Sequence, residues 1–152
     1  MTERRVVVTG MGCVTPLGND LPTTWNNLVA GKNGIGPITK FDTTDFKAKL
    51  AAEVRDFDPK LYMEKPQILH SDLYAQLAMA AAVQAMEDSG IAGTVPGERM
   101  GVYIGTGIGG IQTFETEHSK LLNKGPRRVS AYFIPMMIAN IASSMIAIRY
   151  GC

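Results

Sequence analysis

The residues of this chain that could carry out covalent chemistry are few and widely separated. Its two cysteines are Cys13 and Cys152, and its two histidines are His70 and His118. A nucleophile needs a base within hydrogen-bond reach, and zinc ligands usually come in closely spaced pairs. None of the four residues has such a neighbour in the sequence. We therefore expect Cys13 to be a small buried hydrophobic residue, both histidines to be structural, and no metal to be bound.

The most distinctive spacing occurs in MGVYIGTGIGG, residues 100–110. The apolar run Val102–Ile104 predicts a buried strand, the glycines interrupt it, and helical spacing begins at Ile111. A strand, a glycine loop and a helix in this order often form a binding site, because the backbone N–H groups of the loop converge at the start of the helix. The loop could bind a dinucleotide, form a tight turn, or line a pocket for an uncharged chain, with Ile108 pointing into it. A dinucleotide site expects an acidic residue roughly 20 positions on, and none follows Glu117.

Local patterns predict the elements that would hold this loop. The β-branched run Val6–Val8 is typical of a strand covered on both faces. Asp20 is placed to cap a helix that has Pro22 in its first turn and ends at Gly31. The inner face of that helix would consist of Trp25, Leu28 and Val29.

The middle of the chain contains the clearest helix. Residues 31–49 are predicted to be a mostly irregular connection, followed by a short strand at 53–57. Residues 71–89 are rich in alanine, leucine and methionine and end at Gly90, which predicts a core helix. The resulting order of strands and helices favours an α/β layered architecture.

Residues 131–148 contain no charged side chain, and 18 residues is close to the length that spans a membrane. Pro135, Asn140 and two serines make the segment a poor membrane span. We therefore expect one helix buried on all sides, in a core or a subunit interface.

Composition indicates one globular domain: 152 residues, of which 45% are hydrophobic and 19% charged. The net charge of +1 gives no general attraction to nucleic acid. Two cysteines without a disulfide framework, and an N-terminus unlike a secretory signal, favour the cytoplasm. Cations gather after Glu117 without any acid among them, as a basic patch or a solvated face. They are Lys120, Lys124, Arg127, Arg128 and Arg149.

Several motifs follow one another in a specific order along nearly the whole chain. They are RRVVVTGMG (4–12), TPLGN (15–19), Trp25, GKNGI (31–35), FDTTDF (41–46), QAMEDSG (84–90), GTGIGG (105–110), KGPRRVSAYFIP (124–135) and IANIA (138–142). This ordered set resembles the N-terminal part of the β-ketoacyl-acyl carrier protein synthases, closest to the type II bacterial elongating enzymes.

The resemblance implies an α/β, thiolase-like fold of layered αβαβα type, in which two similar halves pack together, usually within a homodimer. Residues 1–152 would form most of the N-terminal half, cut before the catalytic nucleophile. The implied reaction is a decarboxylative Claisen condensation of an acyl chain with malonyl-acyl carrier protein, with no cofactor and no metal.

The resemblance places no catalytic residue within these 152 positions. The family's nucleophilic cysteine lies in a Thr-Ala-Cys motif at a helix N-terminus, where the helix dipole favours the thiolate. That motif is absent here, and the two catalytic histidines and the lysine of the family would lie further on. Cys152 stands in Tyr-Gly-Cys, before the strand that leads to the nucleophile, and is not assigned that role. An end directly after the predicted apolar helix favours a truncated chain.

The resemblance implies two sets of site residues in this sequence: residues of an acyl-binding pocket and residues of a docking surface for the carrier protein. Ile108 matches a residue that lines the family's acyl tunnel. The segment that reaches the partner subunit's tunnel is matched by Phe133, Ile134, Met137 and Ile138. The basic residues that meet the acidic carrier protein are matched by Lys65, Arg127 and Arg128. Residues 66–69 lack the further basic residues of the family, which shifts the expected docking toward the arginine pair.

Two rival functions remain open at the level of the sequence. A non-catalytic chain-length subunit of a polyketide synthase would have the same fold, with its nucleophile replaced. A dinucleotide-binding domain would belong to a different class.

Overall fold

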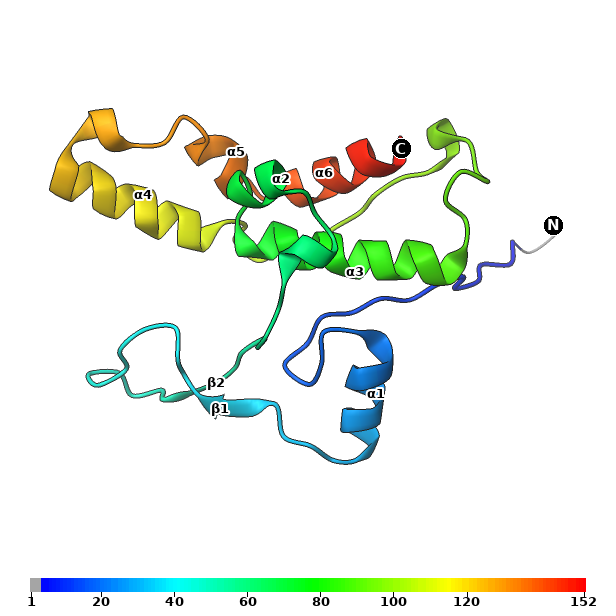
Figure 1. Cartoon of the computed structure of the whole chain (residues 1–152), viewed down its shortest axis with the longest axis horizontal. Coiled ribbons are helices and arrows are strands. Elements are labelled where there is room, and N and C mark those ends of the chain that lie inside the picture. The colour runs from blue at the N-terminus through cyan, green and yellow to red at the C-terminus, as the bar shows by residue number, and fades with distance from the viewer. Residues whose placement is uncertain (1–3) are drawn as a thin grey trace.

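The computed structural model describes residues 4–152, which are mainly helical (Figure 1). The α-helices of this part are α1 (Leu21–Val29), α2 (Lys65–Leu69), α3 (Leu73–Ser89), α4 (Ile111–Lys124), α5 (Phe133–Met137) and α6 (Ile141–Tyr150). Short 3-10 turns are η1 (Pro59–Leu61), η2 (Gly97–Arg99) and η3 (Pro126–Arg128). The one sheet in residues 4–152 is an antiparallel pair of β1 (Ile35–Pro37) and β2 (Leu50–Ala52), with Ile35 opposite Ala52.

Helix α3 runs through the middle of the molecule (Figure 1). On one side of it lie α1 and the β1–β2 hairpin, and on the other lie α2, α5 and α6. The main buried cluster joins α3 to α6 and to the turn before α2, through Met63, Met79, Val83 and Ile146. The small alanines of α3 allow this close approach, as the sequence predicted.

The helices predicted from caps are confirmed. The Asp20 carboxylate accepts a hydrogen bond from the Thr23 N–H at 2.7 Å and caps α1. Gly31 follows α1 with φ +66°, and Gly90 ends α3 with φ +62°, both in the left-handed region that glycine tolerates. The predicted inner face of α1 is wrong: its Trp25 is 60% exposed, because no element among the described residues covers that side of the helix.

The strands predicted at Val6–Val8 and Val102–Ile104 are not formed. Val6 is 91% exposed and Tyr103 fully exposed, although both segments were expected to be buried. A strand requires a neighbouring backbone that exchanges hydrogen bonds with it, and no segment of residues 4–152 lies in that position. The strand predicted at 53–57 is also wrong, since β2 ends at Ala52.

Glycines let the N-terminal segment lie flat on α3. A Cβ atom at Gly10 would lie 2.3 Å from the carbonyl oxygen of Ala85, and one at Gly12 would lie 2.2 Å from that of Ala81. Hydrogen bonds from the Met11 and Cys13 N–H groups to α3 side chains fix the segment there. This close contact explains the Gly-x-Gly pair without a ligand.

The uncharged segment 131–148 is not one buried helix, as was predicted, but the two helices α5 and α6. Between them Ile138 is extended (φ −63°, ψ 140°), and its carbonyl oxygen accepts a hydrogen bond from the Tyr74 hydroxyl. Ile134 is 54% exposed and Ile148 is 83% exposed. Within residues 4–152 we find no helix with both the length and the apolar character needed to cross a bilayer.

Candidate functional site: an apolar hollow beside a glycine loop

An apolar hollow of about 260 Å³ lies where the glycine loop meets α4 and α5. It is lined by Ile108, Gly110, Ile111, Phe114 and Met137. None of these residues carries a charge. Ile108 is 67% exposed, so the hollow is open on one side. Such a surface suits an uncharged hydrocarbon group rather than a phosphate or a sugar.

The glycines of the loop bring the two walls of this hollow together. The Gly110 N–H donates to the Met137 carbonyl oxygen at 2.9 Å. A Cβ atom at Gly110 would lie 2.4 Å from the Met136 carbonyl oxygen, so any larger residue would separate α4 from α5. The Gly109 N–H donates to the Thr106 hydroxyl at 3.2 Å. Both N–H groups are therefore engaged within the protein, which argues against a dinucleotide phosphate at this loop.

The structure brings some of the predicted acyl-binding residues together and leaves others apart. Ile108 and Met137 line the same hollow. Phe133 lies against its edge, with its ring centroid 6.2 Å from that of Phe114. Ile134 and Ile138 are not among the lining residues.

Ile111 and Phe114 line the hollow but were not proposed as site residues from the sequence. They are three positions apart on α4, so both lie on the same face of the helix, next to Ile108. That helical spacing was visible in the sequence, and it was the only available signal.

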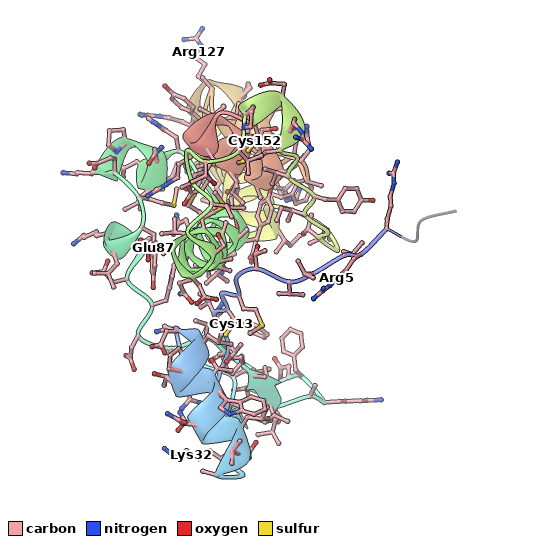
Figure 2. All side chains as sticks on the ribbon, turned by 90° about the vertical axis from the view of Figure 1, so that its right-hand side faces the viewer. Arg5, Cys13, Lys32, Glu87, Arg127 and Cys152 are labelled. Atoms are coloured by element: carbon pink, nitrogen blue, oxygen red, sulfur yellow. The ribbon has the colours of Figure 1, made fainter. Side chains whose placement is uncertain are left out.

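The predicted docking residues occupy two separate elements. Lys65 is the first residue of α2 and is exposed, while Arg127 and Arg128 are exposed on η3. Figure 2 shows the Arg127 side chain pointing away from the body of the molecule. Helix α2 is linked to the start of α5 by His70, whose ring stacks on that of Tyr132 with centroids 3.8 Å apart.

A second hollow, of about 630 Å³, is lined by Lys120, Lys124 and Arg128. Of these, Lys120 forms an ion pair with Glu117 at 2.6 Å, the one ion pair found within residues 4–152. This contact and the N–H of Ser130 hold the pKa of the Glu117 carboxyl below its usual value. Three of the five predicted cations therefore lie together, with Lys120 paired to Glu117, whereas Arg149 lies apart on α6 and donates to the Tyr62 carbonyl oxygen.

The cysteines and histidines do not form a catalytic or metal-binding group. Cys13 is half-buried rather than fully buried as expected, Cys152 is exposed, and both are free thiols. His118 stacks on Phe114 with centroids 5.9 Å apart, and His70 stacks on Tyr132. These contacts fit the structural role expected for both histidines. In the part of the chain that the structure describes, no cluster of three or more potential metal ligands occurs.

Comparison with known proteins identifies the family. Residues 3–152 match the family model described as the N-terminal domain of β-ketoacyl synthase. A 3-oxoacyl-[acyl-carrier-protein] synthase 2 from Coxiella burnetii is 48% identical over 151 residues, covering 99% of this chain and 36% of the relative. A homologue of the same name from Synechocystis is 43% identical over 152 residues. The chain therefore spans about a third of the length of these curated relatives.

Solved structures of ketosynthases have the same fold. One, described as the ishigamide ketosynthase/chain length factor, matches with a TM-score of 0.80 at 29% identity, over 97% of this chain and 37% of its own. Another is a type II polyketide synthase acyl-carrier protein in complex with its ketosynthase, with a TM-score of 0.80 at 22% identity over 98% of this chain. The family model and the relatives together show that the chain belongs to the β-ketoacyl synthase family and corresponds to its N-terminal domain.

Proposed function

We propose that this chain is the N-terminal part of an elongating 3-oxoacyl-[acyl-carrier-protein] synthase, an acyltransferase of fatty acid biosynthesis. The observation that carries the proposal is the uncharged hollow beside the GTGIGG loop, in a chain 48% identical to a synthase of that name. The lining residues Ile108, Ile111, Phe114 and Met137 would hold the end of an acyl chain.

In this proposal, the residues needed for the condensation are distributed between this segment and the part of the protein that follows it. The acyl group moves from the carrier thioester to a cysteine thiol, and the carrier thiol leaves. Malonyl-carrier then loses CO₂, and the resulting carbanion attacks the acyl-cysteine thioester, which forms a C–C bond and releases the thiolate. In this proposal the segment holds the acyl chain, while the nucleophile, the two histidines and the lysine would follow Cys152.

A homodimer would cover the apolar surface at α5. Ile134 is 54% exposed, and Phe133 lies at the edge of the hollow, with its ring against that of Phe114. In this proposal, Phe133, Ile134 and Ile138 extend toward the acyl tunnel of a second subunit. Exposed aromatic and aliphatic side chains of this kind are typical of subunit interfaces.

An acidic acyl carrier protein would dock on the cations of this chain. Arg127 and Arg128 are exposed, and neither forms an ion pair within residues 4–152. Lys65 would contribute from α2. A solved ketosynthase complex with an acyl-carrier protein supports a partner of this kind for the fold.

The remaining expectations concern the intact protein. The extended, apolar segments Val6–Val8 and Val102–Ile104 would become strands of the thiolase-like αβαβα layers once neighbouring strands pair with them. The reaction needs no metal and no nucleotide cofactor. We place it in the cytoplasm, in line with the two free cysteines.

The main alternative is a chain-length subunit without a nucleophile, which is supported by the similarity to a ketosynthase/chain length factor. The two proposals differ in the sequence that follows Cys152. A Thr-Ala-Cys motif within roughly fifteen residues supports the synthase, and a different residue at the cysteine position supports the chain-length subunit.

A dinucleotide-binding domain is the alternative from another class. Titration of the full-length protein with NADH, followed by fluorescence, tests it directly. Saturable tight binding would favour it over both condensing-enzyme proposals, and we expect none, because the Gly109 and Gly110 N–H groups already have partners.

A further inference from the structure

One buried carboxylate caps two helices that are far apart in the sequence. Asp72 is 5% exposed and precedes α3, where its Oδ1 accepts a hydrogen bond from the Tyr74 N–H at 3.4 Å. Its Oδ2 accepts from the N–H of Thr113 at 2.8 Å and from the Thr113 hydroxyl at 2.7 Å. Thr113 lies in the first turn of α4, whose own N-cap residue, Gly110, has no side chain to offer. Asp72 therefore replaces the missing cap of α4.

The first turn of α3 also contacts the end of α5, which forms the other wall of the hollow. The Tyr74 hydroxyl donates to the carbonyl oxygen of Ile138 at 2.5 Å, directly after α5 ends. Burial raises the pKa of the Tyr74 phenol, which favours the protonated hydroxyl that donates this hydrogen bond. Ile138 follows Met137, which lines the hollow.

We propose that Asp72 and Tyr74 are positioning residues that set the width of the acyl pocket. Asp72 fixes the start of α4, which carries Ile111, and Tyr74 fixes the end of α5, which carries Met137. Neither anchor lines the hollow itself. This inference rests on the proposed function, because the pocket it describes is the proposed acyl site.

The two anchors add to direct contacts between the walls, which include the Phe114 ring against the Phe133 ring. The Gly110 N–H to Met137 carbonyl hydrogen bond is the direct backbone link between the loop and α5. Without the Asp72 cap, the first turn of α4 loses its charged acceptor, and the loop that carries Ile108 can move outward. A wider pocket then accepts longer acyl chains relative to short ones.

The test uses the full-length protein and measures kcat/KM for a long and a short acyl-carrier substrate. In Asp72→Ala, the ratio of kcat/KM for the long substrate to kcat/KM for the short one is expected to rise about tenfold. A factor of about ten is the lower end of the discrimination that one methylene group produces in an apolar pocket. Tyr74→Phe removes only the hydroxyl and is expected to raise the ratio less. Asp72→Asn keeps an acceptor oxygen and is expected to restore most of the original ratio.

A matched control separates positioning from general stability. Asp20→Ala removes the N-cap of α1, where the carboxylate accepts from Thr23, a residue that does not line the hollow. It is expected to lower the midpoint of urea unfolding and to leave the ratio unchanged. An equal loss of kcat/KM on both substrates in Asp72→Ala, or the same shift in Asp20→Ala, would overturn the inference.

Further variants test the two anchors if Asp72→Ala cannot be studied. If Asp72→Ala does not fold, Thr113→Val, which retains the N–H group but loses the hydroxyl, and Tyr74→Phe still test the two anchors. An unchanged ratio in both variants would show that α3 does not set the pocket width. If the unmodified protein extends no acyl chain, the proposed function fails, and that result is distinct from an active enzyme whose ratio does not move.

Discussion

At the scale of the residue, Ile108 is the side chain that the glycine loop contributes to the proposed acyl site. It lines the hollow together with Met137 and is 67% exposed. Ile108→Phe adds an aromatic ring to a space of about 260 Å³ and is expected to block long acyl chains while sparing short ones. The measurement is the chain-length profile of the full-length variant.

Ile35→Phe is the matched control for that substitution. Ile35 is exposed on β1, which is not among the elements that line the hollow. We expect its chain-length profile to equal that of the unmodified protein. A profile that is equally unchanged in Ile108→Phe would remove Ile108 from the acyl site.

At the scale of the element, the contact between the glycine loop and α5 depends on the missing side chain of Gly110. A Cβ atom there would lie 2.4 Å from a backbone oxygen, which cannot move away as a side-chain end can. Gly110→Ala is expected to destabilise the full-length protein by roughly 1–3 kcal/mol, the usual cost of overpacking. Urea unfolding measures this difference.

Ser119→Ala provides the comparison, because Ser119 is exposed on α4 and does not line the hollow. We expect a change of stability within about 0.5 kcal/mol, as for most surface substitutions. Equal destabilisation by both substitutions would mean that the close packing at Gly110 is not what holds α4 to α5.

Elements whose signals are local were predictable from the sequence. The Asp20 cap and the Gly31 and Gly90 ends of helices act within one turn of the chain, and α1 and α3 were predicted correctly. Strands depend on a partner that may lie anywhere in the chain. The runs at Val6–Val8 and Val102–Ile104 carried the right residue types, but they have no such partner among residues 4–152.

The candidate site was predictable only where its signals are local in the sequence. The glycines of the GTGIGG loop indicated a close backbone approach, and Ile108 and Met137 were both proposed as acyl-binding residues. The role of Asp72 could not be predicted, because its partner Thr113 lies 41 residues away and no local pattern joins them.

At the scale of the whole molecule, the chain exposes far more surface than a compact protein of its size. Its accessible surface is 10964 Å² for a mass of 16.4 kDa. A compact monomer of that mass exposes roughly 7,500 Å². The excess of about 3,400 Å² indicates surfaces that a larger assembly covers. At about 25 cal/mol per Å² of apolar surface, leaving roughly 400 Å² of apolar surface uncovered forgoes about 10 kcal/mol, comparable to the net stability of a domain.

Residues 1–152 produced alone are therefore expected to lack condensing activity and to aggregate or bind a hydrophobic dye strongly. Light scattering and dye fluorescence measure this against the full-length protein. A monodisperse monomer that unfolds cooperatively would contradict the fragment interpretation.

The exposed cations of η3 predict how the proposed carrier protein would dock on the whole molecule. Arg127→Glu combined with Arg128→Glu is expected to raise KM for acyl-carrier substrates, mainly through a slower on-rate, and the difference is expected to shrink as salt rises. Activity on a small acyl thioester should be nearly unchanged.

Lys32→Glu combined with Lys47→Glu changes the net charge equally at other exposed positions. Lys32 lies at the opposite end of the molecule from Arg127 (Figure 2). We expect a much smaller rise in KM for this control. Equal effects of the two double substitutions would show that total charge, rather than a docking surface at η3, governs the encounter.

The proposed elongation of acyl chains by the full-length protein is tested most directly by one measurement. The full-length protein is incubated with an acyl-carrier protein and a malonyl-carrier protein, and the products are followed by mass spectrometry together with CO₂ release. We predict a β-ketoacyl-carrier product lengthened by the malonyl-derived unit, with one CO₂ released for each product formed. A folded protein that gives no lengthened product, or that releases CO₂ without forming a C–C bond, would contradict the claim.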